Sequence, residues 1–376
     1  MSIEINLKRK LWPRTFRFTG NYRTYTIVIF ITFFITLTIY SYHYTSTNII
    51  DELKAFSEER ESDKIILRFE RRRKHLNDEC KKFGLDKPGT DHNHKLNAWE
   101  FLINEEYGLV YCNIFKAASS SWLYNFNLLA GYSPEYLENA SKTPVSLARS
   151  KYPRPSREYL QEALNKHLSF IIVRHPFERL VSAYVDKFIK NAKKEYFRKI
   201  GMKIIEATRT KWRELNGSHL TTLSSEVKKK IEELKYVDDS LPPTFEEFIR
   251  YIICESKSHN RLNEHWEPMT PFCTPCLANF DLIMKFETLE EDQNYLIKMA
   301  KLEKIIEPKW KNPTNKEHKN ISNTYFSQIS NEQLYDLMNL YRYDFALFQY
   351  SSDQYSNFVQ KNLTNLPCYS VRFKYL

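Results

Sequence analysis

Two apolar runs in the middle of the chain have the length and composition of buried β-strands. Residues 109–114 read Leu-Val-Tyr-Cys-Asn-Ile, and residues 168–173 read Leu-Ser-Phe-Ile-Ile-Val. A helical pattern follows each of them, over residues 121–130 after the first strand and from Pro176 after the second. Because buried strands alternate with helices, the sequence predicts an α/β fold with a parallel sheet and helices on both faces.

The helix that begins at Pro176 divides its apolar and polar positions clearly. Its apolar residues recur at helical spacing and predict one buried face, which is made of Phe177, Leu180, Val181, Tyr184 and Phe188. Arg179 and Ser182 lie off this face. Both are therefore candidates for contact with solvent or a ligand.

A third apolar run lies near the N-terminus. Residues 24–50 contain no Lys, Arg, Asp or Glu, and within them residues 25–42 are mostly apolar. At a rise of about 1.5 Å per residue, this run just spans a hydrocarbon core of ~30 Å. A helix buried in a protein core is the alternative, but the terminal position and the flanking charges favour a membrane span.

The charges around this run predict its orientation. Asp51 and Glu52 follow it, and the basic residues before it are Lys8, Arg9, Lys10, Arg14, Arg17 and Arg23. Positive charge stays in the cytosol, and no small-residue cleavage site follows the run. We therefore expect a type II membrane protein, with a cytosolic tail over residues 1–24, an uncleaved signal anchor over residues 25–42, and the remainder in the lumen.

Beyond the span, composition divides the chain into a stem, a main domain and a tail. Residues 43–95 are charged and poor in apolar residues, which predicts a helical, solvated stem. The main domain is expected over residues 96–350, where Thr244 and Glu247 have the spacing of a capping box at the start of a helix. Residues 351–376 are assigned to a C-terminal tail.

Both predicted strands end in turns that suit an anion. A helix start presents unpaired N–H groups and a partial positive charge, and ligands of a parallel sheet bind beyond the carboxyl ends of its strands. Arg174 follows the second strand. The candidates after the first strand are Lys116, Ala117, Ala118, Ser119, Ser120, Ser121 and Trp122. The serine-rich turn alone would also fit an ordinary capped helix start, but with the second turn it predicts a ligand with two anionic groups.

Glycine usage excludes two familiar phosphate sites. The chain has seven glycines and no G-x-G-x-x-G, so the dinucleotide fingerprint is missing. The only G-x4-G runs from Gly84 to Gly89 and is followed by Thr90, so no Walker A loop exists, which argues against an ATP-dependent kinase. The net charge of +10 suits a polyanionic partner. Nucleic acid would fit that charge, but the predicted topology argues against it, and we expect no nucleic-acid partner.

The two turns carry a resemblance to a known family. Residues 115–122 resemble the 5′-phosphosulfate loop of Golgi carbohydrate sulfotransferases of the chondroitin 4-O-sulfotransferase and HNK-1 sulfotransferase type, and residues 173–188 closely resemble the 3′-phosphate segment of that family. Phe115 replaces a proline of the family and His175 replaces an acidic residue. Further similar segments extend the resemblance over about residues 96–350; they are 243–248, 265–266, 273–277, 286–292 and 343–348.

The resemblance implies a fold and a set of roles. The fold would be the P-loop-like parallel sheet of sulfotransferases, and the donor would be 3′-phosphoadenylyl sulfate (PAPS), with no metal. Lys116 would neutralise charge at the bridging oxygen, and the segment from Ala117 to Trp122 would hold the phosphosulfate. Arg174 and Ser182 would hold the 3′-phosphate. Arg179 is a secondary candidate for that role, because a surface ion pair with Glu178 is its more common use.

The acceptor hydroxyl also needs a general base, for which histidine is the usual choice. We select His265, because His265-Trp266 matches a motif of the family, with an equal chance of a purely structural histidine. His167 and His175 are the next candidates. The expected acceptor is an anionic glycosaminoglycan, with 4-O of N-acetylgalactosamine in chondroitin preferred over a terminal glucuronic acid or dermatan. An inactive luminal glycan-binding protein is the remaining alternative.

Cysteines and sequons bear on the compartment, which the resemblance places in the Golgi membrane. All six cysteines lie beyond the predicted span, as expected in an oxidising lumen. Cys273 and Cys276 form a C-x2-C without a second ligand pair, so disulfides are favoured over zinc, and Cys112 in its core strand is a candidate free thiol. The N-x-[ST] sequons are at Asn139, Asn216, Asn320 and Asn362.

Overall fold

The computed structural model describes residues 22–210, 224–234, 241–307 and 318–360. The chain divides into two compact units, residues 1–63 and residues 64–376, and helix α1 (Tyr22–Phe83) runs through the boundary. The predicted C-terminal tail lies largely outside the described residues, as does the predicted cytosolic tail. Three of the four sequons also fall in segments whose side chains are not described, and only Asn139 remains, exposed at the end of a short helix.

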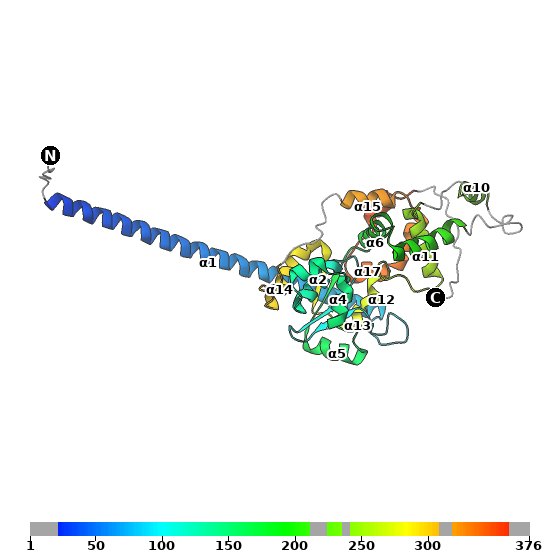
Figure 1. Cartoon of the computed structure of the whole chain (residues 1–376), viewed down its shortest axis with the longest axis horizontal. Coiled ribbons are helices and arrows are strands. Elements are labelled where there is room, and N and C mark those ends of the chain that lie inside the picture. Colours follow the sequence, from blue (N-terminus) through cyan, green and yellow to red (C-terminus); the bar gives the residue numbers. More distant parts are fainter. Residues whose placement is uncertain (1–21, 211–223, 235–240, 308–317, 361–376) are drawn as a thin grey trace, which may run out of the picture. The chain divides into compact units, whose positions relative to one another are not determined.

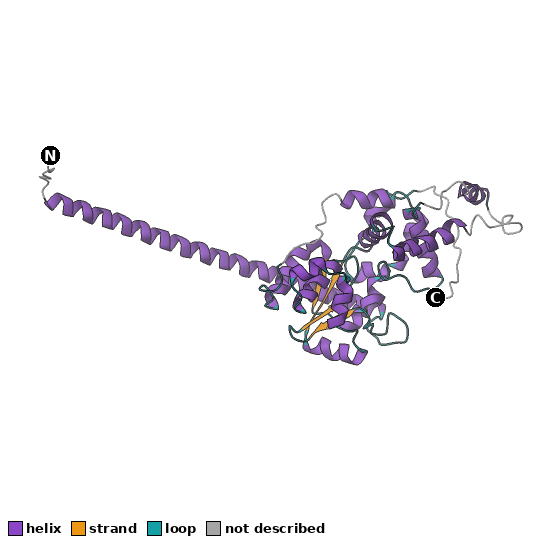
Figure 2. Ribbon diagram, in the orientation of Figure 1, coloured by secondary structure: helices purple, strands orange, loops and turns teal. Residues whose placement is uncertain are grey.

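The second unit contains a four-stranded sheet with the order β1-β2-β3-β4. The strands are β1 (Phe101–Asn104), β2 (Leu109–Cys112), β3 (Leu168–Val173) and β4 (Leu282–Lys285). β2, β3 and β4 are parallel to one another, whereas β1 pairs antiparallel with β2. The predicted α/β class and parallel core are therefore confirmed, with an antiparallel edge strand that the sequence did not indicate. Figure 2 shows the strands with helices around them.

Helices lie between β2 and β3, between β3 and β4, and after β4 in the chain. The helices are α2 (Ser119–Leu129), α3 (Pro134–Asn139), α4 (Pro144–Lys151), α5 (Arg157–Lys166), α6 (Pro176–Tyr184), α7 (Glu195–Ile205), α10 (Ser225–Leu234), α11 (Phe245–Lys257), α12 (Met269–Cys273), α13 (Pro275–Ala278), α14 (Leu289–Met299), α15 (His318–Phe326), α16 (Asn331–Leu340) and α17 (Arg342–Leu347). Two π-helical segments, η1 (Val185–Lys190) and η2 (Glu206–Thr210), and two 3₁₀ segments, η3 (Phe286–Thr288) and η4 (Asp353–Asn357), complete the described part.

The second unit has two hydrophobic clusters. One surrounds the sheet and includes β1 to β4 together with α2 and α14. The other is helical and joins α6, α11 and α16. Figure 1 shows α2, α4 and α5 near the strands, whereas α6, α11 and α15 lie in a separate group. The site residues described below lie where these two clusters meet.

The predicted buried face of α6 is confirmed. All five of its apolar residues are at most 4% exposed and belong to the helical cluster. The predicted capping box is confirmed as well, because Thr244 Oγ1 accepts a hydrogen bond from Glu247 N and the Glu247 carboxylate accepts one from Thr244 N. Helix α11 runs to Lys257, and its buried residues Ile252 and Ile253 pack in the helical cluster.

The N-terminal apolar run is helical, as part of α1. Its apolar side chains from Ile29 to Tyr44 are exposed. Among the described residues, however, no helix combines the length and the apolar character needed to cross a membrane.

The segment expected to be a solvated stem differs from that expectation in its second half. Ile65, Phe69, Leu76 and Cys80 are buried in the cluster around the sheet. They recur every four to seven positions along α1 and so form one stripe of the helix. The dense charges between them hid this stripe in the sequence. Helix α1 from residue 64 onward is therefore part of the folded unit.

Charged residues on α1 reinforce this packing. Asp292 is fully buried and accepts hydrogen bonds from Arg72 Nη1 at 2.6 Å and from Arg68 Nη1 at 3.1 Å. The backbone N–H of Lys285 also donates to Asp292, which brings β4 into the same network. A buried carboxylate is tolerated only when it is paired and hydrogen-bonded in this way. The two arginines of the predicted stem therefore serve as counter-ions of the sheet domain.

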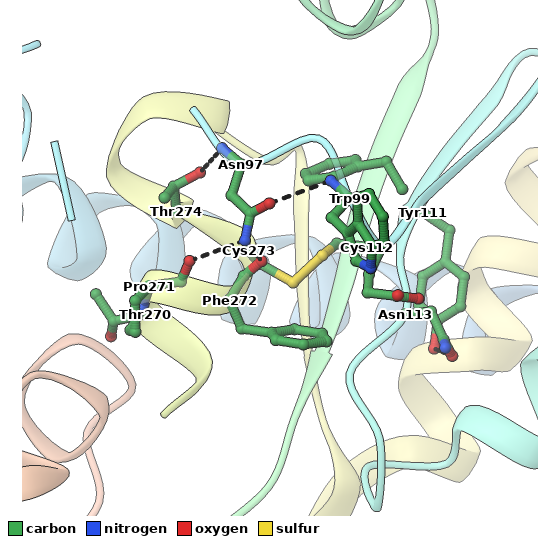
Figure 3. Close-up of a disulfide and its surroundings, with 12 residues drawn as sticks. Asn97, Trp99, Tyr111, Cys112, Asn113, Thr270, Pro271, Phe272, Cys273 and Thr274 are labelled. Carbon is green, nitrogen blue, oxygen red and sulfur yellow. Dashed lines mark hydrogen bonds between the residues drawn. A yellow bond between two sulfur atoms is a disulfide. The ribbon is translucent and has the colours of Figure 1, made fainter. Parts of the chain in front are cut away.

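Between residues that the structure describes, two disulfides join distant parts of the second unit. Cys80 of α1 is bonded to Cys276, and Cys112 of β2 is bonded to Cys273 (Figure 3). The expectation that Cys112 is a free thiol is wrong, because Cys273, the last residue of α12, lies against the end of β2 and is bonded to Cys112. The preference for disulfides over a zinc site is confirmed for both cysteines of the C-x2-C.

Replacing Leu76 by alanine is expected to lower the free energy of unfolding by about 3 kcal/mol, because the fully buried side chain leaves a cavity in a close-packed core. Leu67→Ala is the matched control on the same helix: Leu67 is 52% exposed and its loss should change stability by less than ~0.5 kcal/mol. Urea unfolding followed by tryptophan fluorescence measures both. Equal effects of the two substitutions would contradict the packing of α1 on the sheet.

Candidate functional site

The turn after β2 has an unusual backbone. Lys116 and Ala118 both have positive φ angles, of 69° and 60°, which residues with a Cβ adopt rarely. Alternating conformations of this kind turn successive N–H groups toward one point and form an anion-binding concavity. Helix α2 begins directly afterwards, and the N–H groups of Ser119 and Ser120 donate to no other group in the described segments. The turn thus offers free donors at a helix start.

The side chains of this turn divide into two kinds. Ser120 is exposed and Ser121 is half-buried, so both hydroxyls are accessible, while Ser119 is 8% exposed. Ala117 and Trp122 are fully buried. The Trp122 ring packs against Tyr111 and Phe170 below the turn, which makes it a support for the turn.

The turn after β3 places a cation beside the first turn. Arg174 is 7% exposed, and its Nη1 donates to the backbone oxygen of Lys116 at 3.2 Å. The guanidinium lies over the ring of Phe286 at 4.3 Å. Burial lowers the pKa of this arginine from its ordinary value, partly offset by Glu178 and Glu287. The two strand ends are therefore physically linked through Arg174.

Arg174 has no ion-pair partner within 4.0 Å in the part of the chain described. The two carboxylates whose charges act on Arg174 accept hydrogen bonds from tyrosine hydroxyls: Tyr355 donates to Glu178 and Tyr350 donates to Glu287, each at 2.8 Å. Glu287 also accepts the backbone N–H of His175. A buried guanidinium that lacks a bound carboxylate is suited to an external anion, because the desolvation of its charge is otherwise uncompensated.

Arg179 and Ser182 occupy different environments on α6. Arg179 is 1% exposed and donates to three backbone oxygens, those of Phe115, Glu264 and Glu267, at 2.7 to 3.1 Å. The alternative of a surface ion pair with Glu178 is therefore wrong. Arg179 instead ties the turn after β2 to the loop that precedes α12. Ser182 is half-buried, and its hydroxyl makes no hydrogen bond to any described residue.

Lys116 is paired with an acid that the sequence did not single out. Its Nζ lies 2.8 Å from Asp186 Oδ2, and Nζ of Lys187 lies 3.0 Å from the same oxygen. Burial lowers the pKa of Lys116, and Asp186 partly offsets this. Burial would raise the pKa of Asp186, but the hydrogen bonds and charges of the two lysines outweigh it and hold that pKa at about 2. Two cations thus share one carboxylate beside the turn.

The π-helical segment η1 explains how Asp186 and Lys187 reach this place. It continues α6 with a wider turn, and π-helical turns are frequent at functional sites. Asn191 Nδ2 donates to Asp186 Oδ1 at 2.8 Å and fixes the carboxylate. The Lys187 ammonium lies over the ring of Phe197 at 4.2 Å. Asp186 and Lys187 both belong to the segment 173–188, which resembles the 3′-phosphate segment of the family. They were not selected as site residues from the sequence, although this adjacent acid–base pair lay within that segment.

His265 lies in the same neighbourhood as Lys116. It is 7% exposed, and its ring lies 4.9 Å from the ring of Phe115. Burial, followed by the charges of Lys187 and Lys116, lowers the pKa of His265 to about 3. The imidazole is therefore neutral at physiological pH and sits in the field of the two lysines.

Asn263 determines which nitrogen of His265 carries the proton. Its Oδ1 accepts the backbone N–H of His265 at 3.1 Å and lies 2.7 Å from Nδ1 of the ring. Because the backbone donor requires the amide oxygen at this position, Nδ1 must be the protonated nitrogen. Nε2 makes no hydrogen bond to the described residues, so its lone pair is available to a ligand. The imidazole is thus oriented as a base.

The other two histidine candidates are placed differently. His175 caps α6: its Nδ1 accepts from Phe177 N, and its Nε2 lies 2.8 Å from Ser351 O. Both of its ring nitrogens are therefore occupied. His167 precedes β3, at the amino end of the strand, and its Nε2 is paired with Glu105. Of the three, His265 alone lies beside Lys116.

The third parallel strand also ends in a cation. Lys285 is the last residue of β4 and pairs with Val173, which precedes Arg174. Its ammonium lies over the ring of Tyr350, and burial, followed by the charge of Arg72, lowers its pKa to about 8. Lys285 was not identified from the sequence, because β4 is short and the residues beside Lys285 in space come from the ends of other strands.

Comparisons with known proteins agree with this geometry. A family model described as Sulfotransferase family matches residues 99–351. Carbohydrate sulfotransferase 11 of Rattus norvegicus is 29% identical over 258 residues, which cover 68% of this chain and 68% of the relative. Carbohydrate sulfotransferase 9 of Homo sapiens is 27% identical over 296 residues, covering 75% of this chain and 60% of the relative.

A further relative, carbohydrate sulfotransferase 14 of Mus musculus, is 27% identical over 258 residues, covering 66% of this chain and 59% of the relative. No solved structure is a significant match. The family match covers more than half of the chain and contains both strand-end turns and His265. The resemblance inferred from the two turns is therefore confirmed, and the chain belongs to the sulfotransferase family.

Proposed function

We propose that the protein is a carbohydrate sulfotransferase that moves a sulfuryl group from PAPS to a hydroxyl of a glycan. The observation that carries this proposal is the unpaired, buried Arg174 guanidinium beside the Lys116 turn. PAPS has two anionic groups, a 5′-phosphosulfate and a 3′-phosphate, and the two strand-end turns offer one cationic place for each. Family membership supports PAPS as the donor substrate.

Each residue of the first turn has a role in this proposal. The free N–H groups of Ser119 and Ser120, and the hydroxyls of Ser120 and Ser121, would donate to the phosphosulfate. Lys116 would exchange Asp186 for the donor and neutralise the negative charge that develops on the leaving 5′-phosphate. Asp186 keeps Lys187 as a partner after that exchange, so no isolated carboxylate is left behind.

The transfer itself is a displacement at sulfur. The acceptor oxygen forms a bond to sulfur while the bond from sulfur to the bridging oxygen breaks, and His265 Nε2 takes the proton of the hydroxyl. The products are a sulfate ester and 3′-phosphoadenosine 5′-phosphate. Because the nucleophile and leaving oxygen lie in line, as in phosphoryl transfer, catalysis rests mainly on positioning and charge stabilisation.

For the acceptor, we propose an anionic glycosaminoglycan, with 4-O of N-acetylgalactosamine in chondroitin as the position sulfated. The chondroitin-type segments from residue 243 to residue 292 support this choice, as does the net charge of +10. The names of three relatives, all carbohydrate sulfotransferases, support a sugar hydroxyl in general. A terminal glucuronic acid and dermatan are the competing acceptors.

We further propose that the enzyme works in the Golgi lumen as a type II membrane protein. Disulfides persist in oxidising compartments, and the described part of the second unit contains the disulfides Cys80–Cys276 and Cys112–Cys273. Asn139, in a sequon, is exposed at the surface. The membrane anchor over residues 25–42 rests on the sequence pattern and the charge asymmetry alone.

Arg174→Ala is expected to weaken binding of 3′-phosphoadenosine 5′-phosphate by roughly ten- to a hundredfold, since one charge-assisted contact is lost. Binding of adenosine 5′-phosphate, which lacks the 3′-phosphate, should change little. Titration calorimetry of both nucleotides against both proteins measures the difference. An equal loss for the two nucleotides would assign Arg174 to another group, and an unchanged affinity for the bisphosphate would remove it from the site.

A further inference from the structure

A large cavity in the second unit is separate from the two turns. Its volume is about 1030 Å³, and neither Lys116 nor Arg174 lines it. Its walls come from the loop before β1, the end of α11 with the loop after it, and the region of α16 and α17. This volume is at the upper end for small-molecule sites and has room for several sugar units.

Exposed cations surround this cavity. Five lysine and arginine side chains line it, and all five residues are exposed; they are Lys95, Arg157, Lys257, Arg261 and Arg342. Lys257 pairs with Asp336 at 2.7 Å, and Arg261 lies 3.8 Å from Glu267. For Lys95, Arg157 and Arg342, no carboxylate lies within ion-pair distance in the described segments. Three of the five cations are therefore open to an external anion.

The acidic residues that line the cavity are mostly buried, so their carboxylates present little surface to it. Asp344 is fully buried and accepts hydrogen bonds from Met269 N, Thr270 N and Thr270 Oγ1. Glu267 and Asp336 are only 16% and 27% exposed in their side chains, against 63% for Arg261. The surface that a ligand would meet is thus predominantly positive, which favours a polyanion.

The cavity shares a loop with the candidate base. Arg261 and Leu262 line it on one side of His265 in the sequence, and Glu267 and Pro268 line it on the other. Arg179 holds this loop through the backbone oxygens of Glu264 and Glu267, and holds the Lys116 turn through the oxygen of Phe115. A chain seated in the cavity would therefore be fixed against the same framework as the reacting groups.

We propose that this cavity binds an acidic segment of the acceptor polysaccharide beyond the sugar that is sulfated. The ligand chemistry is a saccharide chain that carries carboxylates at regular intervals, and Lys95, Arg157 and Arg342 are its main cationic contacts. The inference rests on the proposed function for the identity of the chain as an acceptor. Its consequence is that long acceptors bind better than short ones, through contacts that take no part in the transfer.

The test uses the variant Lys95→Ser, Arg157→Ser, Arg342→Ser of the full chain. The matched control, Lys82→Ser, Lys151→Ser, Lys166→Ser, removes the same charge from exposed residues away from the cavity. The probe is a long unsulfated chondroitin oligosaccharide, titrated by calorimetry without donor. We expect about tenfold weaker binding for the cavity variant, from three exposed ion pairs, and wild-type binding for the control. Affinity for 3′-phosphoadenosine 5′-phosphate reports that the variant is folded.

Each outcome bears on the cavity independently of catalysis. Unchanged chondroitin affinity in the cavity variant, or an equal loss in the control, would overturn the proposal. Binding of an RNA of equal charge with the same affinity and the same loss in the variant would also overturn it, because the cavity would then select charge and not a saccharide. A transfer assay of the wild type, run separately, reports on the proposed function: weaker chondroitin binding without any transfer would leave the cavity assignment standing and remove the enzymatic one.

Discussion

Lys116→Ala is expected to slow sulfuryl transfer by about a hundred- to a thousandfold, the usual effect of removing one group that stabilises developing charge. Nucleotide affinity should fall much less, because the leaving oxygen gains its negative charge only as the bond to sulfur breaks. The residue stands on a strained turn, with φ of 69°, and its ammonium is held in place by Asp186. Single-turnover rates with labelled PAPS, together with calorimetry of the bisphosphate nucleotide, measure the two effects.

Lys187→Ala is the matched control for this change. Lys187 contacts the same oxygen of Asp186, so its removal takes away the same charge without touching the turn after β2. Its effect on the transfer rate should be at least tenfold smaller than that of Lys116→Ala. Similar losses in the two variants would mean that the transfer rate depends on the combined charge of Lys116 and Lys187, and that Lys116 does not contact the leaving oxygen specifically. A Lys116→Ala protein with near-normal rates would exclude Lys116 from the reaction.

His265→Gln is expected to lower the transfer rate by about a hundred- to ten-thousandfold, as for loss of a general base, while leaving the fold and nucleotide affinity intact. The Nδ1–H bond to Asn263 leaves Nε2 as the acceptor, and glutamine cannot supply a base there. His167→Gln is the control, since that ring is paired with Glu105 at the other end of β3. Steady-state rates with saturating donor compare the two variants.

The pH dependence offers a second view of His265. In the free protein its pKa is lowered to about 3 by burial and by the neighbouring lysines, so the base form is already complete near pH 5 and no acid-side loss of activity above that pH arises from it. The negative charge of a bound donor offsets those lysines and should raise the pKa. Nuclear magnetic resonance of labelled histidine, with and without 3′-phosphoadenosine 5′-phosphate, follows this change. An ordinary pKa in the free protein would contradict the burial of the imidazole beside the two lysines, and near-normal turnover of His265→Gln would make the residue structural.

The sequence predicted the elements whose signals are local. β2 and β3 are continuous apolar runs, and the buried face of α6 follows from helical spacing alone. β1 and β4 were missed because each contains only three consecutive apolar residues before a polar one, over 101–103 and 282–284, and draws its stability from pairing with a neighbour. The packed half of α1 was missed for a related reason: its apolar stripe is sparse among charges, and only the presence of Asp292 shows that two of those charges are internal counter-ions.

The residues of the candidate site were likewise predicted where the signal is local and missed where it depends on contacts between distant segments. The cations of the two turns lie next to strand ends and were found, because a strand followed by a helix places them. Their partners were not: Asp186 is 70 positions from Lys116, and Asn263 acts through a loop with no regular structure. Arg179 shows the limit most clearly. Because Arg179 lies off the apolar face of α6, it was expected to contact solvent or a ligand. It is buried instead, because its guanidinium donates hydrogen bonds to three backbone oxygens.

The proposed activity can be measured as transfer of labelled sulfate from PAPS to unsulfated chondroitin, dermatan and glucuronyl-terminated glycans, followed by disaccharide analysis. We expect label on chondroitin at 4-O of N-acetylgalactosamine, and no label when Lys116 is replaced by alanine. Label only on dermatan or on a terminal glucuronic acid would contradict the chondroitin assignment and keep the transferase. Absence of label on every glycan, from a folded protein that binds 3′-phosphoadenosine 5′-phosphate, would contradict the proposed activity itself.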